Sequence, residues 1–338
     1  MTIVIRRPVG VFVGLAAAAV LLTACGSGPS QVGSALIVGD TSVPVSRIQQ
    51  QLDDLLATQS NVKQAQQQGK LDQTTRLLVT DHVLHQLVAR AASQNGLNVT
   101  DQQVDQVISQ AGGVDKIAQG LEVNRPDTRA AVKDVLLEAA LARKFADTLT
   151  VKFGYVVAAT RQEAVTKAHQ LAAAPASLPA MVTAANAEAR AAGSQGSGGQ
   201  QDATFSISSY LQGVAQAQQQ AQQQGQQAPT EDDGPVFGTP VNTVVTFQPD
   251  AQTSATWIVA LIKSRNTSGT AAPAGSSPAD AAGLATLERI GVSLLQPQAS
   301  QLGVKVSPRY GVWDQVGMQV AASVDQAAGV EIPVQSKP

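Results

Sequence analysis

Aromatic side chains and cysteines are scarce in this chain. Only 3% of its 338 residues are Phe, Trp or Tyr, and Cys25 is the single cysteine. One cysteine cannot form a disulfide within the chain, so no such bond stabilises the fold. With few large rings, the core has to be built from small aliphatic side chains. Such a composition favours helices.

An excess of basic residues and the common motifs of catalysis are also missing. The 23 Lys and Arg face 25 Asp and Glu, and no basic stripe indicates a nucleic-acid partner. The sequence holds no phosphate loop, dinucleotide fingerprint or Gly-x-Ser-x-Gly motif, so we expect no cofactor. His82 and His85 could face one metal ion from a helix, but no further ligand has a suitable spacing. We therefore expect an ordinary helix pair there and no metal site.

The N-terminal residues predict export. Arg6 and Arg7 precede an uncharged apolar run over 9–22, which is too short to cross a bilayer as a helix. A positive start, a short apolar segment and small residues at a cleavage point are typical of a signal peptide. The sequence Leu-Thr-Ala-Cys at 22–25 resembles the bacterial lipobox.

The lipobox resemblance implies that residues 1–24 are removed and that Cys25 receives acyl chains such as palmitate. Two acyl chains hold a protein on a membrane far better than one. We expect a lipoprotein anchored to the cell membrane on its extracytoplasmic face, with residues 25–34 as a spacer. The mature chain keeps 21 basic and 25 acidic side chains, a net charge of −4.

Residues 35–149 predict a short strand followed by helices. The apolar run 35–38 predicts a strand, and helical spacing of apolar side chains predicts helices within 46–56, 72–95, 101–108 and 126–149. Gly96 is a suitable C-cap for the second of these. Thr100 and Gln103 have the spacing of a capping box at the start of the third.

The pattern changes at residue 150. Strands are expected at 151–158, 243–247 and 255–262, with helices at 161–172 and 178–190. A Gln-rich insertion over 191–230 has little apolar surface to bury, although 210–223 could form a solvated helix. A linker over 266–279 precedes a helix at 280–295 and an extended stretch at 303–306. We expect residues 315–338 to be a flexible tail.

Three stretches in this order resemble the SurA and PrsA group of extracytoplasmic chaperones. They are ALIVGDTSVPVSRIQQQLDDLL, GLNVTDQQVDQVI and VKVSPRYGVWD. The resemblance implies an α+β fold in which a mostly helical SurA-N-like domain over 35–149 is completed by the helix and strand of 280–314. Leu36–Val38 should then lie beside Val304–Val306. A strand this short is unstable without a partner, which favours the same pairing.

The same resemblance implies that 150–265 is a small parvulin-like α/β insert. Parvulins that catalyse prolyl isomerisation carry a His on each of two strands. Matching the turn TRQEA puts Tyr155 at the first position, and matching Arg265 puts Ile258 at the second. Neither is His, so the insert resembles a degenerate parvulin and we expect a scaffold without catalysis.

We expect a non-catalytic, chaperone-like binder of unfolded or exported polypeptides. An envelope scaffold with one specific partner and an active prolyl isomerase are the alternatives. Tyr310, Trp313 and Phe145 could contact a bound peptide; the two rings near the C-terminus could instead anchor the closing segment on the helical core. Apolar helix residues such as Leu84, Leu87, Leu136 and Phe145 could serve either a core or a cleft.

Overall fold

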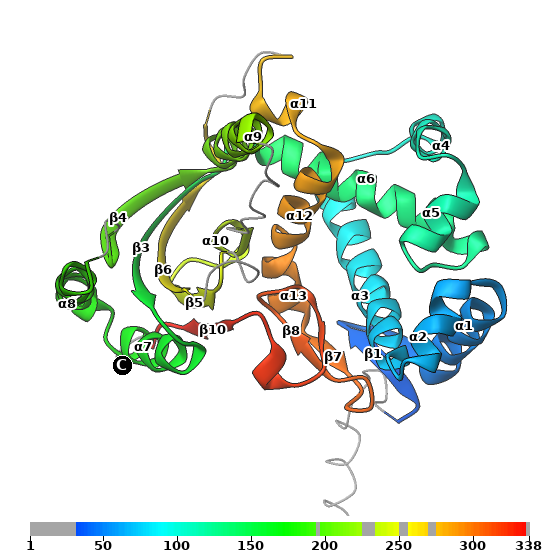
Figure 1. Ribbon diagram of the computed structural model, residues 1–338, viewed down its shortest axis with the longest axis horizontal. Coiled ribbons are helices and arrows are strands. Elements are labelled where there is room, and N and C mark those ends of the chain that lie inside the picture. The colour runs from blue at the N-terminus through cyan, green and yellow to red at the C-terminus, as the bar shows by residue number, and fades with distance from the viewer. Residues whose placement is uncertain (1–31, 194–196, 225–233, 250–255, 270–274, 336–338) are drawn as a thin grey trace, which may run out of the picture.

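The computed structural model describes residues 32–193, 197–224, 234–249, 256–269 and 275–335, and the fold is α+β as predicted. Cys25 and the export signal lie outside the described residues. The helices and small antiparallel sheets form two halves on either side of α6 (Thr128–Phe145) and α12 (Leu284–Ser293), as Figure 1 shows.

The first half is mostly helical. A short 3-10 turn, Arg125–Asp127, leads into α6. The polar stretch after Gln59 also forms a helix, which the sequence did not predict; Val62 is completely buried there and fixes this helix against its neighbours. The elements before α6 are β1 (Ser34–Val38), β2 (Thr41–Pro44), α1 (Val45–Thr58), α2 (Ser60–Gln67), α3 (Leu71–Asn95), α4 (Asp101–Gln110) and α5 (Val114–Gly120).

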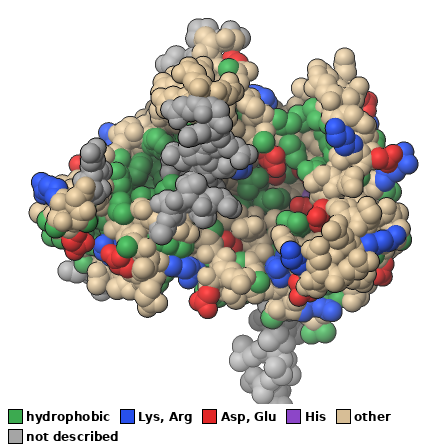
Figure 2. All heavy atoms as spheres, viewed as in Figure 1, with side chains coloured by type: hydrophobic (Ala, Val, Ile, Leu, Met, Phe, Trp, Pro, Cys, Tyr) green, Lys and Arg blue, Asp and Glu red, His purple; other side chains and the backbone are tan. Residues whose placement is uncertain are grey.

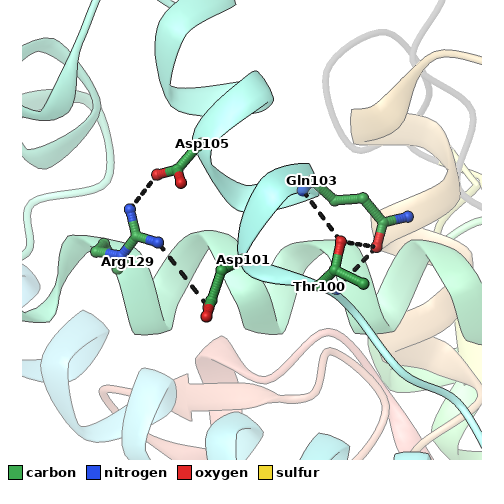
Figure 3. Close-up of polar contacts among 5 residues, drawn as sticks. All are labelled: Thr100, Asp101, Gln103, Asp105 and Arg129. Atoms are coloured by element: carbon green, nitrogen blue, oxygen red, sulfur yellow. Dashed lines mark hydrogen bonds and ion pairs between the residues drawn. The ribbon is translucent and has the colours of Figure 1, made fainter.

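Both predicted helix ends around residue 100 are confirmed. Gly96 ends α3 in the left-handed conformation, with φ of 64°. At the start of α4, Thr100 and Gln103 form the capping box, each side chain bonding the other residue's backbone N–H. Arg129 of α6 pairs with Asp101 and Asp105 of α4, which orients α4 across α6 (Figure 3).

The predicted closing of the first half by the end of the chain is confirmed. β7 (Val304–Val306) pairs antiparallel with β1 in the register Leu36↔Val306, Ile37↔Lys305 and Val38↔Val304. The sheet order is β2-β1-β7, so β1 is its central strand and has neighbours on both edges.

The second half is a five-stranded antiparallel sheet in the order β10-β5-β6-β3-β4. Its strands are β3 (Thr150–Ala158), β4 (Gly199–Ser206), β5 (Thr243–Phe247), β6 (Trp257–Asn266) and β10 (Val330–Pro333). α7 (Arg161–Ala173) and α8 (Leu178–Ala191) cover the convex face. α9 (Ile207–Gln224), α10 (Gly234–Gly238), α11 (Pro278–Ala281) and α12 lie on the concave side (Figure 1).

The Gln-rich insertion contributes more to the fold than its composition predicts. β4 pairs with β3 along its length, and α9 buries Ile207, Tyr210 and Leu211 in the concave core. Backbone pairing does not require apolar side chains, which is why a stretch rich in Gly and Gln can add a strand. Residues 194–196 and 225–233 of the insertion lie outside the described residues.

The helix expected over 280–295 is in fact two helices. α11 begins at Pro278 with Ser277 as N-cap, and extended backbone at Ala282 and Gly283 separates it from α12. α13 (Gln296–Leu302) then leads into β7.

The prediction of a flexible tail over 315–338 is wrong. β8 (Val312–Asp314) pairs with β9 (Gln319–Ala321), and β10 covers the edge of β5. The buried Asp314 carboxylate fixes the turns between them by accepting hydrogen bonds from the backbone N–H groups of Val316, Gly317 and Ala328. The end of the chain therefore contacts both halves, because β9 packs on α3, where Val320 N–H donates to Thr80 Oγ1, and β10 joins the five-stranded sheet. Residues 336–338 alone lie outside the described part of this segment.

Close packing of α12 on α6 joins the two halves. A Cβ built at Gly291 would lie 2.0 Å from the Glu138 carbonyl oxygen, closer than any real contact. Only glycine allows the two helix backbones to approach this closely.

We predict that Gly291→Ala destabilises the protein by about 1–3 kcal/mol, because an added methyl group forces the helices apart. Gly213→Ala is the matched control: Gly213 also lies in a helix, but an added Cβ there meets no atom within 4 Å. That variant should be neutral or slightly more stable. Denaturant unfolding of both variants checks this, and equal stabilities would contradict the proposed close contact.

Candidate binding cleft between helices α3 and α6

A cleft of about 310 Å³ lies between α3 and α6. α1 and the segment after α5 form its sides, and Glu288 of α12 lies at one end. Hydrophobic and acidic side chains gather in a hollow over this region in Figure 2. The lining residues are Arg47, Gln51, Leu78, Asp81, His82, Leu84, His85, Leu121, Val123, Asn124, Asp127, Ala130, Ala131, Asp134, Val135, Glu138 and Glu288.

Helical spacing places the lining residues of α3 and α6 in rows. On α6, Ala130, Asp134 and Glu138 follow one another at four-residue steps, so they share one face. On α3, Leu78, His82 and His85 form the facing row. The cleft is therefore the space between two helix faces that each mix apolar and titratable side chains.

One wall is held by a chain of hydrogen bonds. His82 Nε2 pairs with Gln51 Oε1 at 2.7 Å, and Gln51 Nε2 donates to Asp127 Oδ2 at 3.0 Å. Asp127 also meets Arg47 at 3.6 Å. Burial and the positive charge of Arg47 lower the pKa of His82, so this ring is neutral at pH 7. His82 is thus a fixed part of the wall.

His85 has a separate partner. Its Nδ1 lies 2.7 Å from Asp134 Oδ2. This hydrogen bond raises the pKa of His85 and favours the charged imidazolium. The two histidines therefore point to different partners, and within the described residues no group of three or more His, Cys, Asp or Glu could hold a metal ion.

Four carboxyl groups from three helices face one another in the cleft. We call Asp81, Asp134, Glu138 and Glu288 the acidic set. Burial, then repulsion from Glu288, Asp134 and Asp81, raises the pKa of Glu138 well above its usual value. Burial likewise raises the pKa of Glu288. Both pKa shifts are in the direction of the neutral acid.

Asp81 reaches water inside the cleft, yet protein surrounds it on most sides. This confined position, with repulsion from Asp134 and Glu288, raises the pKa of Asp81 to about 7. The pKa rises because protein surrounds this carboxylate on most sides and because it faces like charges.

The structure shows which of the apolar helix residues lie in the core and which line the cleft. Leu87 is fully buried in the helical core, and Leu136 packs against that core. Leu84 lines the cleft. Phe145 packs against the cores of both halves and faces a different, smaller cavity beside Arg265, so it does not contact the cleft.

Tyr310 and Trp313 also lie away from the cleft. Tyr310 is 8% exposed in the helical core, and Trp313 packs against the same core while its Nε1 donates to Gln315 Oε1 at 2.9 Å. This arrangement matches the anchoring alternative for both rings. Tyr310 in addition lines a separate cavity of about 440 Å³ beside α1.

Tyr155 and Ile258 lie on neighbouring strands and on the same concave face of the five-stranded sheet. In the β3–β6 register Tyr155 is opposite Ala260, and Val157 is opposite Ile258. The Tyr155 ring is 6.0 Å from Phe153, which begins a cluster of rings that continues through Phe205, Tyr210 and Phe237. The surroundings of these two positions are thus apolar.

No protein-family model matches the chain, and a search of curated proteins finds no match either. The likeness to SurA and PrsA therefore stays a prediction. Along the described ranges, no helix combines the length and apolar character that crossing a bilayer requires.

The sequence analysis did not predict the acidic set, although the spacing of two of its four members was a usable signal. Asp134 and Glu138 are four residues apart in one predicted helix, a spacing at which like charges repel. Repulsion between the two carboxylates destabilises the helix unless another interaction offsets it. Asp81 and Glu288 join the set only through tertiary packing, which the sequence does not show.

We predict that Glu138→Gln raises the thermal unfolding midpoint at about pH 8 by about 2–4 °C or more. The raised pKa of Glu138 means that its contribution to stability is present at acidic pH and is lost as pH rises, because the unfolded chain ionises first. Gln cannot ionise, so its advantage should grow from about pH 4 to pH 8.

Scanning calorimetry across this pH range measures the effect. Glu188→Gln is the matched control, since Glu188 is exposed on α8. If the midpoints of the two variants differ from wild type by the same amount at every pH, Glu138 does not carry the predicted cost.

Proposed function

We propose that this chain is a membrane-anchored extracytoplasmic lipoprotein that binds segments of exported polypeptides without catalysing a reaction on them. The observation that carries this proposal is the cleft, where apolar side chains of α3, α6 and the segment after α5 lie side by side and reach solvent. Its volume of about 310 Å³ is at the lower end for a ligand pocket, which suits a few side chains of an extended segment.

The apolar edge of the cleft supports binding of unfolded chains. Leu121 is 40% exposed at the cleft, and Leu84, Val135 and the exposed Ala130 continue this surface. Unfolded polypeptides expose the aliphatic side chains that such a surface would cover. The apolar surroundings of Tyr155 and Ile258 favour a binding role over acid–base catalysis in the second half.

Light scattering of two unrelated denatured proteins tests the binding function. The wild type should suppress their aggregation, and Leu121→Ser should weaken suppression about five- to tenfold, because it removes part of a Leu side chain's burial. Leu77→Ser is the matched control: Leu77 is also 40% exposed but does not line the cleft.

Three results would count against the proposal. Equal effects of the two Leu variants would show that the cleft takes no part in suppressing aggregation. Capture of one stoichiometric partner without suppression of aggregation would indicate an envelope scaffold. Isomerisation of proline peptides that is lost on mutating Tyr155 would indicate an enzyme.

The anchor is proposed from the lipobox, and its distance from the fold is short. Eight residues, 26–33, separate Cys25 from the first residue of β1. We predict that Cys25→Ser moves the protein from the membrane fraction to the soluble fraction and abolishes labelling by a palmitate analogue. Circular dichroism should be unchanged, since Ser replaces Cys with a side chain of similar size; membrane association that persists in the variant would contradict lipid anchoring.

A further inference from the structure

Three of the four carboxyl groups in the acidic set have no positive partner among the described residues. His85 pairs with Asp134, and Arg47, the one Lys or Arg of the cleft lining, pairs with Asp127. In the part of the chain that the structure describes, Asp81, Glu138 and Glu288 form no ion pair. The cleft therefore places three carboxyl groups without described ionic partners among apolar side chains.

Glu138 gives a second, independent indication that something binds here. Its residue is 3% exposed and lines the cleft, yet no described residue donates a hydrogen bond to its carboxyl group. Its burial removes most of the water from this carboxyl group and no ion pair with a described residue replaces that water, which costs stability. A ligand that supplies the missing donor would remove that cost.

The chemistry of the cleft specifies the donor. A Lys ammonium or Arg guanidinium carries several N–H donors and a positive charge, and bonds to carboxylates are the strong ones among hydrogen bonds. The stem of either side chain is apolar and suits Leu78, Leu84 and Val135 along the walls. A neutral apolar side chain would leave Glu138 unpaired, and an acidic one would be repelled.

We propose that the cleft selects polypeptide segments in which a Lys or Arg is flanked by apolar residues, the cation lying among the acidic set. This inference rests on the proposed function and specifies which segments are held. Binding of the cation favours the ionised carboxyls, so it is accompanied by release of protons to solvent.

Several titratable and charged groups around the cleft affect how cation binding depends on pH. They are Arg47 on α1, Asp81, His82 and His85 on α3, Glu122 and Asp127 in the segment between α5 and α6, Asp134 and Glu138 on α6, and Glu288 with its neighbour Arg289 on α12. Because burial and repulsion raise the pKa of Asp81 to about 7 and also raise the pKa of Glu138, binding of a cation should strengthen as pH rises through about 7.

Isothermal titration calorimetry on the full-length protein in detergent tests the proposal. Three unfolded peptides are compared that share flanking Leu and Val residues and carry Lys, norleucine or Glu at the centre. At about pH 8 the Lys peptide should bind about tenfold tighter than the norleucine peptide, and the ratio should shrink at about pH 5.5. Its binding heat should change with the ionisation enthalpy of the buffer, since protons are released.

Variants assign the preference to the acidic set. Glu138→Gln should bring the ratio of Lys to norleucine affinities close to one, and Asp81→Asn should reduce it, which provides a second variant with an accessible side chain. Glu188→Gln should keep the wild-type ratio. N-butylammonium in place of the peptide separates the sources of the cation: binding as tight as that of the Lys peptide would indicate a small-amine site and overturn the proposal.

Failure of this inference differs from failure of the proposed function. Equal affinity for the Lys and norleucine peptides, with aggregation still suppressed, would overturn the cation preference and leave the binding function standing. Absence of both peptide binding and suppression would overturn the two together.

Discussion

Helix α6 belongs to both halves of the molecule, and its contact with α12 fixes their geometry. Val132, Leu137 and Leu141 of α6 lie in the helical core, whereas Ala139 and Ala142 lie in the core against the concave sheet. Gly291 lets α12 approach the carbonyl of Glu138. Glu288 lies three residues, nearly one helical turn, before Gly291, so the same contact brings its carboxyl group to the end of the cleft. The packing that joins the halves thus also assembles the acidic set.

The cleft combines features that oppose stability. Burial and mutual repulsion raise the pKa of Asp81 and Glu138, and the fold bears this cost through extensive apolar packing elsewhere. Perturbed titratable groups of this kind gather at functional sites more often than on ordinary surfaces. By contrast, the described rings at residues 153, 155, 205, 210 and 237 form a packed cluster, so the second half has few polar groups on its concave face.

Local signals predicted much of the fold, and tertiary contacts account for what they missed. The capping box at Thr100, the C-cap at Gly96 and the β-branched and aromatic residues of β3 act within a few residues. The strand pairing of Leu36–Val38 with Val304–Val306 followed from a resemblance. The ordered tail was missed because its order comes from Asp314 and from the edge of β5, both distant in the sequence. The cleft was missed for the same reason: three helices supply its carboxyls, and only Asp134 and Glu138 share one of them.

Pairing of the first strand with a strand near the end of the chain has a consequence for biogenesis. For a chain that crosses a membrane from its N-terminus, as we propose, β1 arrives long before residues 304–306, and β5 long before β10. Contacts between residues so far apart in sequence form slowly and late. Neither half can be completed until nearly the whole chain has been translocated. Until then the tethered polypeptide would itself expose apolar segments at the membrane surface, and its maturation would depend on the timing of export.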